Sequence, residues 1–114
     1  MGKLIKSFGW AVNGLRAVWR EEINFRIELA TGLVVLISSF YLNFSIFELV
    51  IVIGCIGAVL SAEILNTVVE DICNKIEPNT DSMIGKIKDM MGGFVLVVGL
   101  TSLGVGIMIF SNYL

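Results

Sequence analysis

Three polar residues share one face of a long apolar segment. Glu63, Asn66 and Glu70 stand at relative positions 0, 3 and 7, which at about 100° per residue places them on one side of a helix. The stretch before Glu63, from Leu49 to Ala62, carries no charge, and a carboxylate at that depth in a membrane is costly unless it serves a site or has a partner. The stripe therefore indicates a binding or reactive pocket. The alternative is a helix-packing contact closed by a lysine or arginine from elsewhere in the chain.

Other charged residues fall at the borders of apolar segments. One group precedes the first such segment and comprises Glu21, Glu22, Arg26 and Glu28. Glu22 and Arg26 stand four residues apart, a spacing that also suits an ordinary surface ion pair. Lys88 and Asp89 precede the last apolar segment, where a lysine can neutralise a phosphate and an aspartate can hold a ligand hydroxyl. Lys88 and Asp89 are therefore candidate phosphate contacts.

Several classes of chemistry are excluded by composition. The chain has no histidine, so Ser-His-Asp and Cys-His catalysis and histidine metal sites are absent, and any metal must be bound by carboxylates. It has no G-x-x-x-x-G-K-[ST] loop, so a nucleotide site would not be a P-loop. A net charge of -2 without a basic patch argues against nucleic acid. Cys55 and Cys73 fall on one expected helix about 27 Å apart, too far to bridge, and are expected to be inert thiols.

Hydrophobicity predicts a membrane protein. The chain is 56% hydrophobic and 16% charged, with a mean hydropathy of +0.90, which is too apolar for a soluble domain. Uncharged stretches cover residues 29–47, 49–62 and 90–114 and predict transmembrane helices. The second continues past Glu63 without glycine until Pro78, so it is expected to project from the bilayer into water.

The fold expected from these features is all-α, a single integral membrane domain over residues 1–114. Its parts are an interfacial helix over 1–26, transmembrane helices over 27–47, 48–76 and 86–112, and a cytoplasmic loop over 77–85. Asp81 or Ser82 is expected to cap the last helix. Glycines in that helix are expected to allow close helix packing; they include Gly92, Gly93, Gly99, Gly104 and Gly106.

Charge distribution predicts the orientation. All eight basic residues lie before the first span or between the second and third, so the N-terminus and the second connection are expected on the cytoplasmic side. Apolar residues before the first span recur at helical spacing and suit a helix lying on the membrane surface: Leu4, Phe8, Val12, Leu15 and Trp19.

Longer motifs connect these residues to a known family. Gly14-Leu15-Arg16-Ala17 is followed by Glu22-Ile23-Asn24-Phe25-Arg26-Ile27-Glu28, then by Ala62-Glu63-Ile64-Leu65-Asn66-Thr67 with Glu70, and finally by Lys88-Asp89. This series, which spans most of the chain, resembles the prokaryotic diacylglycerol kinase family, which includes undecaprenol kinases. The resemblance implies a homotrimer in the bacterial cytoplasmic (inner) membrane, with active sites between neighbouring subunits.

The same resemblance implies roles for individual residues, with ATP and Mg²⁺ as cofactors. Glu63 resembles the general base and Asn66 a residue that orients the site, while Glu22 and Glu70 resemble the pair that holds the metal of the ATP complex. Further nucleotide contacts are implied for Lys3, Trp10, Asp81, Lys88 and Asp89. Contacts with the lipid are implied for Arg16, Arg26, Glu28, Glu63 and Gly92.

Two departures from the family pattern concern the ligand sites. Many members carry Glu-x-His where this chain has Asn79-Thr80-Asp81, and small residues where it has Met90, Met91 and Phe94. The expected activity is transfer of phosphate from ATP to a lipid hydroxyl, converting diacylglycerol to phosphatidic acid, with undecaprenol as the alternative acceptor. Two alternative functional hypotheses are an ion conduit lined by Glu63 and Glu70, and a membrane adaptor whose polar stripe mediates assembly.

Overall fold

The computed structural model describes residues 2–114, and these form four α-helices. They are α1 (Gly2–Glu21), α2 (Ile23–Tyr41), α3 (Ile46–Ile76) and α4 (Ser82–Phe110). The last three are long and apolar enough to cross a membrane, with mean hydropathies of 1.5, 2.2 and 2.3. The all-α fold with three candidate spans is thereby confirmed.

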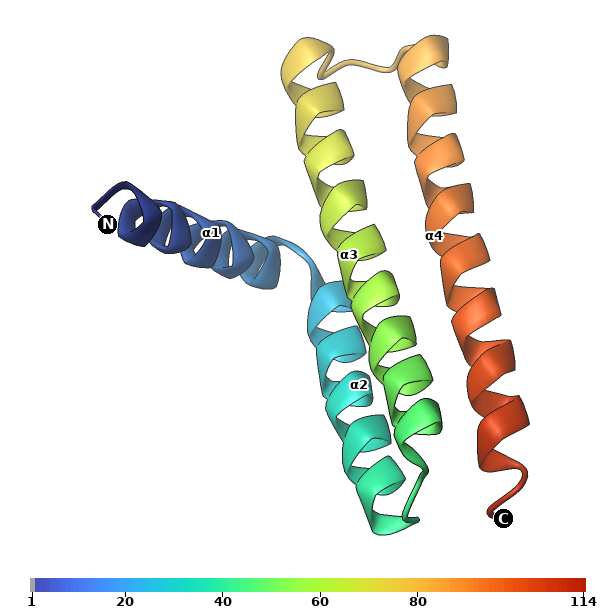
Figure 1. The fold of residues 1–114 in the computed structure, drawn as a ribbon. Coiled ribbons are helices and arrows are strands. Elements are labelled where there is room, and N and C mark those ends of the chain that lie inside the picture. Colours follow the sequence, from blue (N-terminus) through green and yellow to red (C-terminus); the bar gives the residue numbers. More distant parts are fainter. Residues whose placement is uncertain (1) are drawn as a thin grey trace.

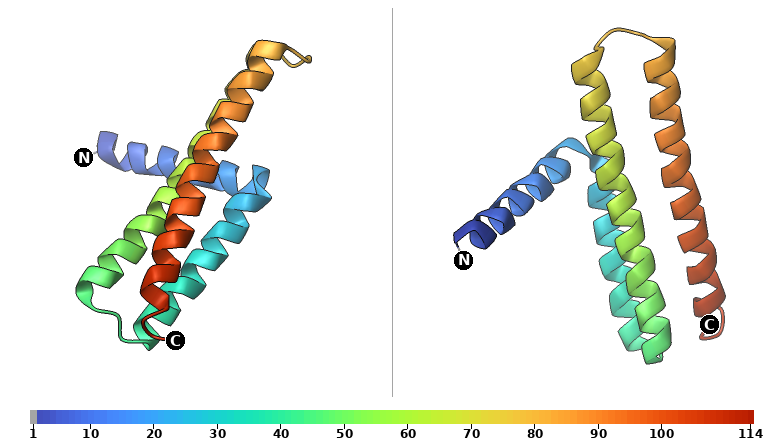
Figure 2. Two further views of the ribbon diagram at one scale, coloured as in Figure 1. Left: turned by 90° about the vertical axis from the view of Figure 1, so that its right-hand side faces the viewer. Right: turned by 45° about the horizontal axis from the view of Figure 1, so that its top comes forward.

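The chain folds into a flat bundle, and α3 stands at its centre. Helices α2 and α4 each pack along α3, but within residues 2–114 they do not pack against each other. Figures 1 and 2 show α1 leaving the bundle at a steep angle near the start of α2, while α3 and α4 extend beyond that level. The subunit accordingly measures 49 × 42 × 20 Å.

The break between α1 and α2 is a single residue. Glu22 has extended backbone angles, φ −121° and ψ 109°. Its N–H donates to the Val18 carbonyl oxygen at 2.9 Å at the end of α1. Its side chain makes no capping hydrogen bond to α2. The carboxylate is therefore free to face α3, where the candidate site lies.

Capping side chains set the other helix starts. Ser45 and Glu48 form a reciprocal capping box at α3, preceded by Asn43 in the left-handed region at φ 59°, which asparagine tolerates better than most residues. Asp81 Oδ1 accepts the backbone N–H groups of Met83 and Ile84 at 2.9 and 3.0 Å. The predicted cap of the last helix is thus confirmed at Asp81.

Glycine packing occurs at a different place from the one expected. Gly32 of α2 is buried, and a Cβ there would lie 2.9 Å from Cγ2 of Ile56 on α3. By contrast, a Cβ on any of the α4 glycines would meet nothing within 4 Å. Close helix contact inside the subunit therefore depends on Gly32, and the expectation for the α4 glycines is wrong within one subunit.

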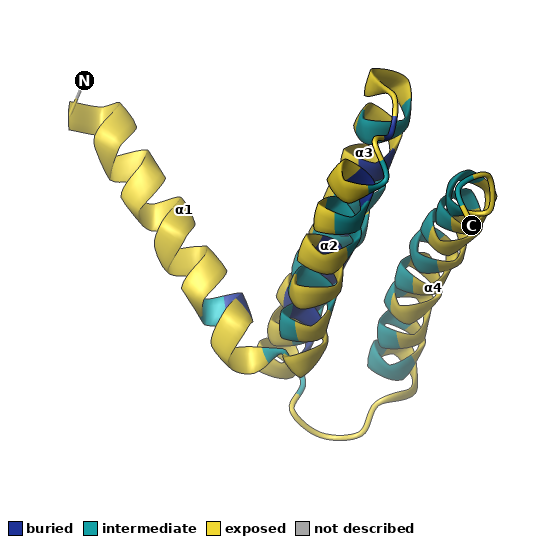
Figure 3. Cartoon of the chain, turned by 90° about the horizontal axis from the view of Figure 1, so that it is seen from below, coloured by how far each residue is buried: buried dark blue, intermediate teal, exposed yellow. Residues whose placement is uncertain are grey.

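Exposure divides the helices sharply. Figure 3 shows that α1 is exposed along almost its whole length and that α4 is half-buried only on the side toward α3. Val18 is the one buried residue among those described in α1, and none of α4 is buried. Apolar side chains of α1 are exposed in the isolated subunit, as for Phe8 and Trp10, so this helix needs a membrane or a neighbour to cover it.

Candidate active site

Three buried polar atoms have no hydrogen-bond partner within residues 2–114, and all belong to residues singled out from the sequence. They are Arg26 Nε, Glu28 Oε2 and Glu63 Oε1. Helix α2 supplies the first two and α3 the third. Folded proteins satisfy most such groups, and the exceptions commonly await a ligand or ion. Glu28 on α2 and Glu63 on α3, whose carboxylates repel each other, mark the candidate site.

Glu63 is the most deeply placed of these residues, with 2% of its surface exposed. The next turn of α3 supports it: the Thr67 hydroxyl donates to the Glu63 carbonyl oxygen at 3.0 Å, and Thr67 is itself 3% exposed. Asn66 interacts with the Glu63 carboxylate, and Glu28 lies near enough to repel it. The predicted stripe thus places a carboxylate and an amide together on the buried face of α3.

Glu22 joins the same acidic cluster from the α1–α2 break. Burial raises the pKa of Glu22, and repulsion from Glu70, Glu63, Glu21 and Asp71 raises it further. Arg26 is not among the groups that act on its charge, so the alternative of a simple Glu22–Arg26 ion pair is not supported. Instead, the carboxylate with the largest effect on the charge of Glu22 is Glu70; these are the two residues expected to hold a metal.

A second carboxyl pair links α1 to α3 at the edge of this cluster. Hydrogen bonding with the Asp71 side chain is the main cause of a raised pKa at Glu21. Both residues are exposed. Sequence reasoning did not pair them, because Glu21 and Asp71 are fifty positions apart.

Lys88 is positioned by a residue that the sequence analysis missed. Its Nζ donates to Oδ1 of Asn74 at 2.7 Å, joining α4 to α3. Asn74 stands eleven residues after Glu63 and four after Glu70, so it extends the stripe by one more turn. Continuing the stripe beyond Glu70 would have found it.

Comparison with known proteins agrees with this geometry. Residues 9–110 match the sequence profile of the prokaryotic diacylglycerol kinases. The chain belongs to that family. It is 33% identical to an undecaprenol kinase of Bacillus subtilis over 96% of this chain and 89% of the relative. It is 30% identical to a diacylglycerol kinase of Escherichia coli K12 over 83% of this chain and 78% of the relative. It is 26% identical to a diacylglycerol kinase of Haemophilus influenzae over 82% of this chain and 80% of the relative.

Membership makes the chain a membrane lipid kinase, an enzyme that uses ATP. The relatives are named as kinases. The comparisons therefore do not support the two alternatives from the sequence, an ion conduit or a non-catalytic adaptor. The identity of the lipid is open at this level, since both kinds of acceptor occur in the names of the relatives.

Several residues expected at a kinase site lie away from the cluster in a single subunit. Figure 1 shows the N-terminal end of α1, which carries Lys3 and Trp10, directed away from the bundle. Arg16 is exposed on the same helix and lies 3.5 Å from Asn13 Oδ1. On α4, Asp89 and Gly92 are exposed. None of these residues is buried beside Glu63 in this chain.

Carboxylates of the cluster fit a magnesium–nucleotide complex better than a metal ion alone. Within residues 2–114 no three candidate ligands converge to form a complete metal site. Mg²⁺ in kinases is commonly held by one or two carboxylates together with substrate phosphates. Glu22 and Glu70, repelling each other without a cation, match that requirement.

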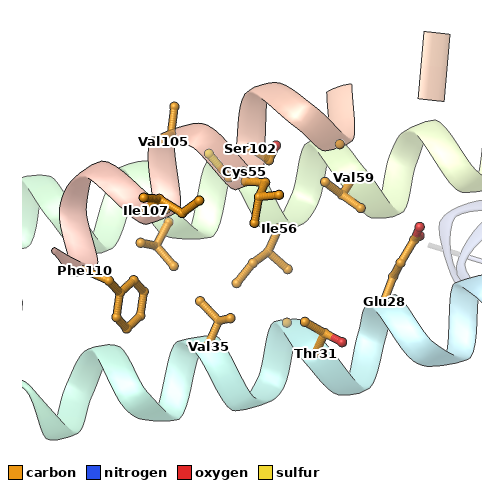
Figure 4. Close-up of a pocket in the computed structure, with 15 residues that line it drawn as sticks. Glu28, Thr31, Val35, Cys55, Ile56, Val59, Ser102, Val105, Ile107 and Phe110 are labelled. Atoms are coloured by element: carbon orange, nitrogen blue, oxygen red, sulfur yellow. The ribbon is translucent and has the colours of Figure 1, made fainter. Parts of the chain in front are cut away.

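An apolar groove runs from this cluster toward the opposite end of the subunit. It lies between α2, α3 and α4, encloses about 420 Å³, and includes Glu28 in its lining. Its walls include Gly32 and Val35 of α2, Val52 and Val59 of α3, and Gly99 and Gly106 of α4. Figure 4 shows Glu28 at one end of the lining side chains and Phe110 at the other. A polar site therefore adjoins an apolar channel.

Proposed function

We propose that the chain transfers the γ-phosphoryl group of ATP to the hydroxyl of diacylglycerol, forming phosphatidic acid. One observation carries the proposal: Glu28, whose Oε2 is buried without a partner, lines the apolar groove and also lies close enough to repel Glu63, the buried carboxylate of the acidic cluster. A lipid with a hydroxyl at the end of hydrocarbon chains offers both a donor for those oxygens and apolar surface for the groove.

Glu63 is the general base of this proposal. Its buried carboxylate accepts the proton of the lipid hydroxyl as the oxygen attacks the γ-phosphorus, and the bond from that phosphorus to the bridging oxygen breaks to release ADP. Asn66 orients the Glu63 carboxylate, which it contacts. Arg26 and Glu28 bind the polar end of the lipid through their free Nε and Oε2 atoms.

Nucleotide binding is assigned to the cytoplasmic side of the cluster. Glu22 and Glu70 would hold Mg²⁺, which neutralises charge on the β- and γ-phosphates when bound. Lys88, held by Asn74, offsets the charge that develops on the transferred group, and Asp89 follows it on α4. Further nucleotide contacts are proposed for Lys3, Trp10 and Asp81.

The proposed active unit is a homotrimer in the bacterial inner membrane, with the N-terminus in the cytoplasm. The direction of α1 supports shared sites, because this helix, which carries Lys3 and Trp10, runs away from the bundle that holds the cluster. A neighbouring subunit would also cover the exposed apolar side chains of α1 and α4.

Undecaprenol is the second candidate acceptor. The Bacillus subtilis relative is named an undecaprenol kinase and matches more of this chain than the Escherichia coli relative does. Both acceptors present a primary hydroxyl beside apolar chains, so the same residues serve either reaction.

Transfer of labelled phosphate from Mg-ATP to each lipid, measured with purified protein in mixed micelles, tests the proposal. We expect product from diacylglycerol, and a rate lower by about 10²–10⁴-fold in Glu63→Gln. Glu77→Gln, at the C-terminal cap of α3 and outside the cluster, is the control and should retain activity. Absence of product from both lipids, in a protein of unchanged oligomer size, would contradict the proposed activity.

A further inference from the structure

Three aromatic residues close the groove at the end remote from Glu28. Phe44, in the α2–α3 turn, is 6% exposed and packs edge-on against Phe110 with ring centroids 4.8 Å apart. It also packs against Tyr113 at 4.5 Å. Phe110 belongs to the groove lining, so the packed rings form its end wall.

A polar contact fastens this wall. The Tyr113 hydroxyl donates to Oε1 of Glu48, the carboxylate that also accepts the Ser45 N–H at 2.8 Å in the capping box of α3. Phe44 thus lies between Phe110 and Tyr113, and Glu48 holds Tyr113. We call Phe44, Glu48 and Tyr113 the clamp, because they hold Phe110 through its ring contact with Phe44. The clamp ties the end of α4 to the α2–α3 turn, although α2 and α4 do not pack along their lengths within the described residues.

The groove itself has a defined extent. On α4 it runs from Gly99 to Phe110, about 16 Å at the helical rise. Its inner end is marked by Glu28, whose Oε2 is buried and unpartnered. The occupant must therefore present a hydrogen-bond donor at one end and apolar surface along the rest.

We propose that this groove takes one hydrocarbon chain of the acceptor lipid and that Phe110, held by the clamp, limits the length of that chain. The inference rests on the proposed lipid phosphorylation and deepens it. Phe110 becomes a determinant of specificity, and the clamp residues Phe44, Glu48 and Tyr113 position it.

A helix from a second copy of the chain is a poorer occupant. A transmembrane helix extends about 30 Å across the hydrocarbon core and would need a groove open at both ends. Here the aromatic wall closes one end. In addition, a spanning helix would leave the Glu28 oxygen without a donor, whereas a lipid hydroxyl or glycerol headgroup supplies one at that level.

The wall favours an acyl chain over a long polyprenyl chain. An acyl chain can end against Phe110, while a polyprenyl chain has to turn out of the groove into the bilayer. The proposal therefore predicts a maximum in activity along a series of diacylglycerols of increasing chain length.

Chain-length profiles of engineered variants test the role of Phe110. Phe110→Ala should raise the kcat/KM ratio of long-chain to short-chain diacylglycerol about tenfold, the size expected for a change in apolar pocket volume. Phe110→Trp should lower this ratio. Tyr113→Phe removes the hydroxyl but keeps the ring, so it should raise the ratio less than Phe110→Ala does. Leu100→Ala, at an exposed α4 position outside the lining, is the matched control. An unchanged profile in both Phe110 variants would overturn the proposal.

Cys55 provides a measurement that needs no turnover. It lines the groove as a free thiol, and in a Cys73→Ser background it would be the only cysteine. We expect dioleoylglycerol to slow methanethiosulfonate modification of Cys55 severalfold in the full-length protein without ATP. An equal modification rate with and without the lipid would overturn the proposal. A slow equal rate would indicate that a second copy fills the groove, and a fast equal rate that nothing fills it. Protection by lipid without any phosphorylation would instead leave the groove assignment intact and contradict the proposed kinase reaction.

Discussion

At the scale of single residues, the unusual feature is a set of polar atoms buried without partners. A buried unpartnered group typically costs about 1–3 kcal/mol, and more when it is charged. Glu63 and Glu28 carry such atoms within one acidic cluster. That arrangement destabilises the ligand-free protein locally, and bound lipid and nucleotide would relieve it.

The stability of the folded protein is expected to depend on pH through Glu22. Burial and neighbouring carboxylates raise the pKa of Glu22 above 4.5, so its contribution to stability is fully present below that pH and is lost as pH rises through the folded-state pKa. We expect the thermal midpoint of the protein without nucleotide or metal to fall over this range, and to fall less in Glu22→Gln. Thermal unfolding in detergent at a series of pH values measures both. Identical pH slopes in Glu22→Gln and the wild type would refute this reading.

At the scale of the helices, Gly32 decides how closely α2 approaches α3. A methyl group there would lie 2.9 Å from Cγ2 of Ile56, and Ile56 is a β-branched residue with little freedom in a helix. Gly32→Ala should therefore destabilise the protein by about 1–3 kcal/mol, as measured by unfolding in mixed micelles.

Two variants make this prediction specific. Gly54→Ala on α3, where a Cβ meets nothing within 4 Å, should be neutral or slightly stabilising. Adding Ile56→Ala to Gly32→Ala removes the clashing atom and should recover part of the loss. A Gly32→Ala protein as stable as Gly54→Ala would show that the helices can separate freely.

Asp81 has a structural role that can be separated from the proposed nucleotide contact. Its side chain caps α4, so Asp81→Ala should cost about 1 kcal/mol, while Asp81→Asn should keep the cap. If Asp81 also contacts the nucleotide through its charge, Asp81→Asn should change the KM for ATP without changing stability. Unfolding and ATP-dependent kinetics of the two variants, measured side by side, distinguish these roles.

For the molecule as a whole, the flat arrangement separates the residues that are proposed to contact the nucleotide. Glu22, Glu63 and Glu70 act on one another within one chain, whereas Lys3 and Trp10 lie on the outgoing arm of α1. Shared sites predict that inactive Glu63→Gln and Trp10→Ala chains regain activity when mixed and reassembled, because some sites then receive both native residues.

Co-reconstitution of the two variants, with each refolded alone as the control, measures this recovery. Pairing Glu63→Gln with Glu70→Gln should recover less, because both residues lie on α3 and act within one cluster. Equal recovery from the two pairings would contradict the division of the site proposed here.

Features that depend on local period and composition were predictable from the amino-acid sequence. Uncharged stretches specified the candidate spans, the 0, 3 and 7 spacing placed Glu63, Asn66 and Glu70 on one face, and Asp81 was found as a cap. These features follow from the helix repeat and from hydrogen bonds between near neighbours.

Which helix faces meet could not be predicted from the sequence and was seen first in the folded chain. It brought Glu28 to Glu63, Asn74 to Lys88, and Phe44 to both Phe110 and Tyr113. It also moved the close glycine contact from α4 to Gly32. The physical reason is that a helix's period fixes directions around its own axis, whereas contacts between helices depend on their rotation, depth and separation, which side chains distant in the chain set together.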